Sequence, residues 1–370
     1  MTQIFDIAVI GAGIAGASVA ARLADNHSVI VLEMEERPGY HSTGRSAAAF
    51  EPNYGPAPIR ALTRASRELF FNPPAGFSDA PLVLPRETIF VAPEEQNSAF
   101  ERLLAESQGL REIDVKEARR RHPKLREGFA KRAVLDEGTA DLDVDLIHRG
   151  FLRQVKAAGS QVICNAEVTS LDHGSHWTIA TRAGTFHAVI IVNAAGAWAG
   201  KIAALAGARP ISIQPKRRSI AVVPAPEGVS SDDWPLVGDV GETWYCKPQS
   251  GKLLVSPADA TPVDPHDAFA DDMTLAEGIE RFQEAMDIEV SRVEHTWGGL
   301  RSFAADGNPV CGYDAVAQRF FWLAGQGGYG IQTSPALSLL AAALVDDGEV
   351  PKPIADEGFD LLNVLPARFG

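Results

Sequence analysis

The chain has 370 residues, of which 45% are hydrophobic, and it carries a formal net charge of −14 at pH 7. This length exceeds the usual size of one hydrophobic core, so two connected domains are expected. The negative charge disfavours nucleic acid and anionic membrane surfaces as partners. Cys164, Cys246 and Cys311 lie far apart without CxxC spacing, so neither disulfides nor a metal site are expected.

The N-terminal residues MTQIFD lack the basic start and long apolar run of a signal peptide. Later apolar stretches such as 337–345 are shorter than the roughly 20 residues that cross a bilayer. We therefore expect a cytoplasmic protein without a transmembrane segment.

Residues 6–33 read as a strand, a glycine turn, a helix and a second strand. Gly11 permits the tight turn, Gly13 lets the backbone approach a pyrophosphate, and Gly16 lets the helix pack on the strand. Glu33 ends the second strand, where a carboxylate accepts hydrogen bonds from the hydroxyls of an adenosine ribose. The segment therefore predicts a Rossmann-type site for FAD or NAD rather than for a cofactor with a 2′-phosphate.

The chain then departs from a simple nicotinamide domain, because residues 37–58 form a loop rich in Gly, Pro and Ser. Beyond it, hydrophobic periodicity predicts elements in this order: a helix near 61–71, a strand over 82–92, helices near 94–107, 114–121 and 143–158, four short strands within 161–192, strands over 211–223, 244–247 and 252–256, and a helix near 274–286.

Two further glycine turns follow strands, at 192–200 and at 325–330, and the second opens a helix for which Thr333 or Ser334 is the expected cap, with Pro335 near the first turn. Three such turns suggest one elongated ligand, which favours FAD over NAD. The expected fold class is α/β: a split, Rossmann-like FAD-binding domain (1–80, 143–210 and 295–370) plus an antiparallel-sheet substrate-binding domain (81–142 and 211–294).

Several motifs together resemble the D-amino-acid oxidase superfamily and, within it, the bacterial D-arginine dehydrogenases. They are GAGIAG (11–16), PGYHSTGRSAA (38–48), VNAAGAWA (192–199), QPKRRS (214–219), WGGLRSF (297–303) and GQGGYGIQTS (325–334). The resemblance implies a two-domain fold, noncovalently bound FAD and oxidation of an amine that stands beside a carboxylate.

The resemblance also assigns substrate-binding residues. Arg218 and Arg301 would clamp the substrate carboxylate, for which a planar guanidinium is well suited; Arg217, beside Arg218, is the alternative. The remaining residues assigned to the catalytic site are Tyr54, Thr88, Tyr245, Gly328 and Gln332.

The residues that the motifs assign to FAD lie in four stretches of the chain. They are Gly11, Ala12, Gly13, Ile14, Ala15, Gly16, Glu33 and Met34; Thr43, Gly44, Arg45, Ser46, Ala47 and Ala48; Val168, Ala195, Gly196 and Trp198; and Arg301, Gly327, Gly328, Tyr329, Gly330, Ile331 and Gln332.

Two positions depart from the D-arginine dehydrogenases: Ala49 stands where they carry a pocket histidine, and Thr88 where they carry a glutamate that pairs with the substrate guanidinium. Neighbouring strand residues point to opposite faces, so Glu87 does not replace Thr88. We therefore expect a D-amino-acid dehydrogenase for neutral or apolar side chains, with an electron acceptor (quinone, carrier or O2) that the sequence leaves open. The alternatives are an O2-dependent oxidase of glycine, sarcosine or another secondary amino acid, and a degenerate flavin-binding protein.

Overall fold

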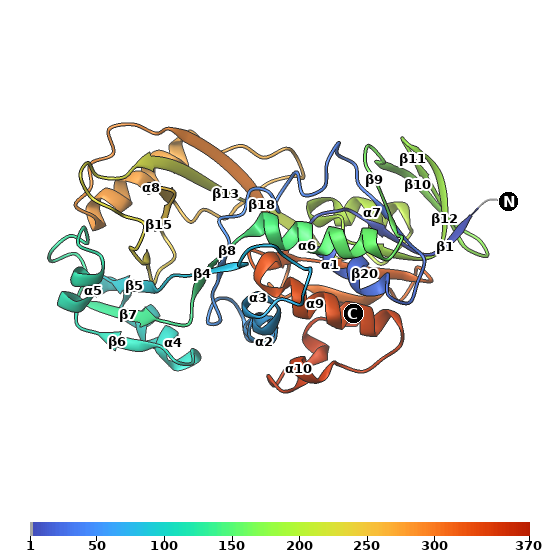
Figure 1. Ribbon diagram of the computed structural model, residues 1–370, viewed down its shortest axis with the longest axis horizontal. Coiled ribbons are helices and arrows are strands. Elements are labelled where there is room, and N and C mark those ends of the chain that lie inside the picture. Colours follow the sequence, from blue (N-terminus) through green and yellow to red (C-terminus); the bar gives the residue numbers. More distant parts are fainter. Residues whose placement is uncertain (1–2) are drawn as a thin grey trace.

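The computed structural model describes residues 3–370, which form two lobes along the long axis of the molecule (Figure 1). One lobe contains the N-terminal strand and the last long helix; the other contains most of residues 86–136 and 213–304. The chain crosses between the lobes several times. Within the described residues, no helix is long and apolar enough to cross a membrane.

The first lobe is built on a sheet whose central strands run parallel, in the order β20, β12, β1, β2, β9. An antiparallel meander of β10 and β11 extends β12, and β19 pairs with β20. The strand bounds are β1 Ile4–Ile10, β2 Val29–Leu32, β9 Gln161–Ile163, β10 Val168–His173, β11 Trp177–Thr181, β12 Gly184–Asn193, β19 Val310–Tyr313 and β20 Phe320–Ala324.

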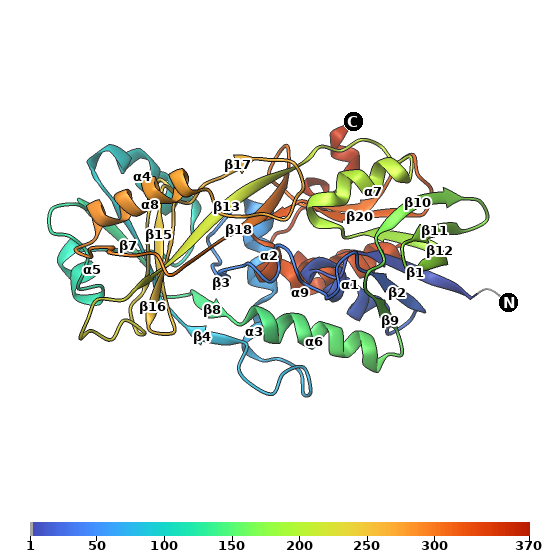
Figure 2. The ribbon, with the colours of Figure 1, turned by 90° about the horizontal axis from the view of Figure 1, so that it is seen from above.

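Both faces of this sheet are buried, which explains the continuous apolar run of β1. Ile7 and Val9 pack in one core with helices α1 (Ile14–Leu23), α6 (Val144–Ala157) and α9 (Gly330–Val345), while Ala8 and Ile10 pack in another core with α7 (Ala199–Leu205). Figure 2 shows the sheet between these layers. The lobe also contains α2 (Ala57–Ala65), α3 (Arg67–Phe71), α10 (Lys352–Ala355) and the 3-10 turns η2 (Gly196–Trp198), η3 (Leu361–Asn363) and η4 (Pro366–Phe369).

The second lobe is a mainly antiparallel sheet in the order β21, β18, β13, β16, β15, β14, β5, β7, β6, with β17 beside β13. Its strands are β5 Thr88–Ala92, β6 Arg111–Ile113, β7 Arg132–Asp136, β13 Ile213–Pro224, β14 Leu236–Asp239, β15 Tyr245–Gln249, β16 Lys252–Ser256, β17 Thr261–Pro262, β18 His295–Ala304 and β21 Gln326–Gly327. Its helices are η1 (Glu94–Gln96), α4 (Asn97–Glu106), α5 (Val115–Arg121) and α8 (Asp272–Ala285).

A small sheet of β3 (Ala49–Phe50), β8 (Ala140–Leu142) and β4 (Val83–Pro85) lies between the lobes (Figure 2). The single strand expected over 82–92 is thus two strands in two sheets, with Pro85 at the end of β4. Proline donates no ladder hydrogen bond, so it is placed where a strand ends.

Two further expectations differ from the structure. Residues 295–304, assigned to the FAD-binding segments, form β18, which pairs along its whole length with β13 in the other lobe. Helix α9 begins at Gly330, so Thr333, Ser334 and Pro335 lie inside it rather than at a cap. The hydroxyl of Ser334 donates to the carbonyl of Ile331 at 2.8 Å, the acceptor that the missing N–H of Pro335 leaves free.

His122, at the end of α5, supplies a test of stability against pH. Its ring packs on Trp234 at 4.5 Å between centroids, and within residues 3–370 neither ring nitrogen has a hydrogen-bond partner. Burial lowers the pKa of His122 from 6.5 to about 4. As the pH falls from 6.5 to 4, the unfolded chain therefore takes up this proton first, and the free energy of unfolding should fall by about 3 kcal/mol.

The measurement is urea unfolding of the native chain and of His122→Phe at pH 7.5 and pH 5. The variant should lose less stability between the two pH values, because it has no imidazole to protonate. An equal loss in both proteins would contradict the prediction.

Candidate active site

Two adjoining cavities run along the boundary between the lobes, with volumes of about 160 Å³ and about 640 Å³. The smaller lies at the carboxyl ends of β1, β2 and β12, where open parallel sheets bind ligands. The two share wall residues Ile14, Ser42, Thr43, Leu300, Gly327 and Gly330. The pair therefore offers one elongated site with a narrow and a wide part.

The narrow cavity has the backbone of a dinucleotide cradle. Gly11 has φ +99°, and a Cβ there would lie 2.6 Å from the carbonyl oxygen of Ala194. A Cβ on Gly16 would lie 1.9 Å from the carbonyl oxygen of Gly11, so the helix packs on the turn only because residue 16 has no side chain. Helix α1 begins here, which places its positive dipole end at the cavity.

Most residues that the motifs assign to FAD line one of the two cavities. The narrow one is lined by Gly11, Gly13, Ile14, Ala15, Glu33, Met34, Val168, Ala195, Gly196 and Trp198, and the wide one by Thr43, Arg45, Ser46, Ala47, Ala48, Arg301, Gly327, Gly328, Tyr329, Gly330, Ile331 and Gln332. Ala12, Gly16 and Gly44 support the walls from behind: the Ala12 N–H donates to Glu33 at 2.7 Å, and the Gly44 N–H donates to the carbonyl of Gly39 at 2.8 Å.

The side chain of Arg45 is directed away from the narrow cavity. Its guanidinium pairs with Asp267 and donates to the carbonyl of Ala268 at 2.6 Å, so it joins the loop after residue 37 to the second lobe. In contrast, the buried Nε2 of Gln332 has no hydrogen-bond partner within the described residues, although Gln332 lines the wide cavity. An unpaired buried donor at this place fits a polar ring such as that of a flavin.

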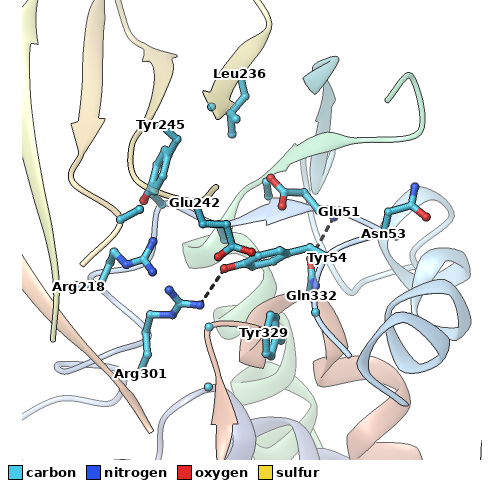
Figure 3. A pocket seen from close by; sticks show the side chains of 18 of the residues that line it. Glu51, Asn53, Tyr54, Arg218, Leu236, Glu242, Tyr245, Arg301, Tyr329 and Gln332 are labelled. Atoms are coloured by element: carbon cyan, nitrogen blue, oxygen red, sulfur yellow. Dashed lines mark hydrogen bonds between the residues drawn. The ribbon is translucent and has the colours of Figure 1, made fainter. Parts of the chain in front are cut away.

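Two guanidiniums lie on one side of the wide cavity (Figure 3). Arg218 is on β13 and Arg301 on the neighbouring β18, where Arg218 is paired with Gly299 and Lys216 with Arg301. Arg301 donates to the hydroxyl of Tyr54 at 2.9 Å, and its buried Nε has no partner within residues 3–370. The pair offers several N–H donors to an anionic group.

Arg217 and Arg218 are neighbours on strand β13, so their side chains point to opposite faces of the sheet. Arg217 pairs with Asp271 at 3.3 Å and with Asp259 at 3.7 Å, and it does not line the cavity. The Nε of Arg218 donates to the carbonyl of Asp259 at 2.8 Å, which orients its guanidinium. Arg218 is therefore the member of the pair that the structure brings together with Arg301.

Gly328 sets the position of Arg301. A Cβ at residue 328 would lie 2.2 Å from one terminal nitrogen of Arg301 and 2.3 Å from its Nε. The guanidinium thus packs directly against the glycine turn that opens α9.

Tyr54, Tyr245 and Tyr329 line the same cavity, and the rings of Tyr54 and Tyr329 meet edge to face at 5.0 Å. Burial raises the pKa values of Tyr54 and Tyr329, although Arg301 partly opposes this shift. Both phenols therefore remain protonated at neutral pH and act as hydrogen-bond donors rather than as bases.

Thr88, expected at the side-chain end of the substrate, does not line the wide cavity. It is 1% exposed, and its hydroxyl donates to that of Thr139 at 3.1 Å, so Thr139 stands between it and the cavity. Glu87 points elsewhere and pairs with Arg121 at 2.5 Å. Thr88 therefore does not contact the cavity directly.

The wide cavity also contains acidic residues that the sequence analysis did not identify, namely Glu51, Glu106, Asp136, Asp239 and Glu242. Burial, together with the nearby Asp136 and Glu242, raises the pKa of Glu51 to about 7. Strand alternation could have identified Glu51. Phe50 points into the core, so its neighbours Ala49 and Glu51 point to the opposite face, toward the cavity.

Comparisons with known proteins agree with this geometry. A family model described as "DAO: FAD dependent oxidoreductase" matches residues 6–344. Glycine oxidase of Geobacillus kaustophilus is 25% identical over 381 residues, with 96% of each chain covered. FAD-dependent oxidoreductase domain-containing protein 1 of Xenopus laevis is 27% identical over 201 residues, which span 49% of this chain and 37% of that protein.

Solved structures share the fold. The crystal structure of the Geobacillus kaustophilus glycine oxidase has a TM-score of 0.82 at 24% identity, covering 94% of this chain and 96% of that one. Dithionite-reduced L-alpha-glycerophosphate oxidase of Mycoplasma pneumoniae with FAD bound has a TM-score of 0.83 at 18% identity, covering 93% and 95%. With its motif, cradle and family match in agreement, the chain belongs to the DAO family of FAD-dependent oxidoreductases.

Proposed function

We propose that this chain oxidises a D-α-amino acid to the 2-imino acid, which hydrolyses to the 2-oxo acid and ammonia. The observation that carries the proposal is the pair of guanidiniums, Arg218 and Arg301, in a cavity continuous with the dinucleotide cradle. Guanidinium groups bind carboxylates with charge-assisted hydrogen bonds. A carboxylate held there would bring the adjacent Cα to a fixed place in the cavity.

In this proposal, different residues of the chain bind the substrate and the flavin ring. Arg218 and Arg301 hold the carboxylate, and the hydroxyls of Tyr54 and Tyr245 add neutral donors beside it. The glycine turn at Gly328 and the amide of Gln332 line the place where the flavin ring fits. When bound noncovalently there, FAD supplies the hydride acceptor at N5.

A second candidate is oxidation of glycine, sarcosine or another secondary amino acid with O2. The similarity to a glycine oxidase over nearly the whole chain favours it. The wide cavity favours a longer substrate, because its lining includes Asp136 and Leu236 and reaches from the arginines past Tyr54 to Asn53 (Figure 3).

The experiment that tests the proposal is anaerobic mixing of the flavin-loaded protein with D- and L-amino acids, glycine and N-methyl amino acids. We expect a D-amino acid to bleach the visible flavin absorbance fastest. Faster reduction by an L-amino acid, glycine or sarcosine would overturn the stereochemical assignment. Absence of reduction by every amine would favour a flavin-binding protein without this activity.

Aeration of the reduced protein then identifies the acceptor class. Rapid hydrogen peroxide formation would mark an oxidase, whereas slow peroxide formation with fast reduction of a quinone or dye would mark a dehydrogenase.

A further inference from the structure

Glu51 is a carboxylate that the proposed reaction leaves without a role. It follows β3 and lines the wide cavity, and its backbone N–H donates to Oε1 of Gln332 at 3.0 Å. Among residues 3–370 its carboxylate oxygens accept no hydrogen bond. In Figure 3 it lies on the opposite side of the Tyr54 ring from Arg218 and Arg301. The two arginines and Glu51 therefore lie on different sides of the Tyr54 ring, and Glu242 lies near the Tyr54 hydroxyl on the side of the arginines.

The charged groups around Glu51 do not neutralise it. Lys247, on β15, forms an ion pair with Asp141 at 2.7 Å. Arg301, on β18, donates a hydrogen bond to the hydroxyl of Tyr54. Two further acids face Glu51, namely Asp136 on β7 and Glu242 before β15. A carboxylate in such a place is stable only when a cation joins it or when it takes up a proton.

Asp136 is already satisfied, in contrast to Glu51. Its carboxylate accepts hydrogen bonds from the side-chain amide of Asn53 and from the backbone N–H of Gly138, both at 2.9 Å. Unlike Asp136, Glu51 is therefore available to a ligand.

We propose that Glu51 binds a positive charge on the side chain of the substrate, so that the preferred substrate is an amino acid with a cationic side chain. The proposal rests on the amino-acid oxidation proposed above and names its substrate class. It differs from the expectation of a neutral or apolar side chain, which was drawn from Ala49 and Thr88; of these two residues only Ala49 lines the cavity.

The charge that meets Glu51 belongs to the side chain rather than to the α-amine. The α-ammonium is one carbon away from the carboxylate that Arg218 and Arg301 hold, and Glu51 lies beyond the Tyr54 ring (Figure 3). Ile220 and Leu236 also line the cavity and give it apolar wall, against which methylene groups can pack. The arrangement fits a flexible aliphatic chain with a cationic end.

The first experiment compares D-lysine with D-norleucine, which have side chains of similar length with and without the ammonium group. With the native protein under anaerobic conditions, we expect kcat/KM for D-lysine to exceed that for D-norleucine by about tenfold or more. If D-norleucine is the better substrate, the Glu51 proposal fails while the proposed amino-acid oxidation stands. If neither D-amino acid nor its enantiomer reduces the flavin, the proposed oxidation itself fails.

The second experiment uses Glu51→Gln, which keeps the shape and removes the charge. It should lower kcat/KM for D-lysine by about 30-fold or more, mainly through KM, and change that for D-norleucine by less than about threefold. Glu51→Asp should recover part of the D-lysine activity, and Glu277→Gln, on the exposed face of α8, serves as the charge-matched control. An equal loss with both substrates, or no loss with either, would overturn the proposal.

The third measurement needs no variant. Because the pKa of Glu51 is raised to about 7, its carboxyl group gains a proton as the pH falls through neutrality. The ratio of kcat/KM for D-lysine to that for D-norleucine should therefore fall between pH 8 and pH 6, since the α-ammonium groups of both substrates titrate above this range and affect both rates alike. The fall should disappear in Glu51→Gln, and a ratio independent of pH in the native protein would count against a charged Glu51 contact.

Discussion

Arg301→Lys is expected to reduce kcat/KM for the best amino-acid substrate by about a thousandfold, equivalent to roughly 4 kcal/mol. Lysine retains the positive charge but loses the planar fork of donors, and it cannot pack flat against Gly328 as the guanidinium does. The hydrogen bond to the Tyr54 hydroxyl would be lost as well. Steady-state kinetics with the preferred substrate measures the effect.

Arg292→Lys is the matched control, because Arg292 lies just before the same strand and is exposed, with Glu294 as its partner at 2.9 Å. The control should keep native activity. Both variants should retain flavin and native melting temperature, so that a loss of activity in Arg301→Lys reports on substrate binding. Activity of Arg301→Lys within about threefold of native would remove Arg301 from the carboxylate clamp.

Gly16→Ala is expected to give protein that does not retain FAD through gel filtration. The added methyl group would lie 1.9 Å from the carbonyl oxygen of Gly11 and 3.3 Å from the side chain of Val9, so the helix must move away from the turn that cradles the pyrophosphate. Overpacking of this kind typically destabilises a protein by about 1–3 kcal/mol. The visible flavin absorbance per chain and the melting temperature measure both effects.

Gly200→Ala tests whether the effect is local. Gly200 is exposed on α7, and a Cβ there meets no atom within 4 Å. Since alanine is the better helix former, this variant should keep FAD and melt at the same or a higher temperature. Native FAD retention in Gly16→Ala would show that the close packing at residue 16 is dispensable.

The first lobe was the easier part to predict because its signals are local. The GxGxxG turn, the two apolar strands and the acid at Glu33 lie within 28 consecutive residues, and each has one steric or electrostatic meaning. The start of α9 was misplaced because a local signal was read incorrectly. Thr333 and Ser334 have the side chains of caps, but their hydroxyls donate to the carbonyls of Tyr329 and Ile331, one turn earlier within the helix.

The side-chain end of the cavity could not be derived in the same way. Its walls come from β3, β7, β14 and the loop after β14, and only the tertiary fold brings them together. Thr88 and Thr139 are 51 positions apart, yet the second separates the first from the cavity. Glu51 belonged to no motif, and its pKa depends on burial and on the distant Asp136, Glu242 and Lys247.

The ladder of the second lobe has a consequence for how the enzyme can open and close. Ser302 and Phe303, which follow Arg301, pair with Gly327 and Gln326 of the turn before α9, so the strand that carries Arg301 and this turn share backbone hydrogen bonds. Arg60 of α2 and Glu106 of α4, 3.7 Å apart, join the lobes across another wall of the same cavity. Separation of the lobes on this side would break the Arg60–Glu106 ion pair, whereas the ladder of β18 and β21 would keep Arg301 next to the turn before α9.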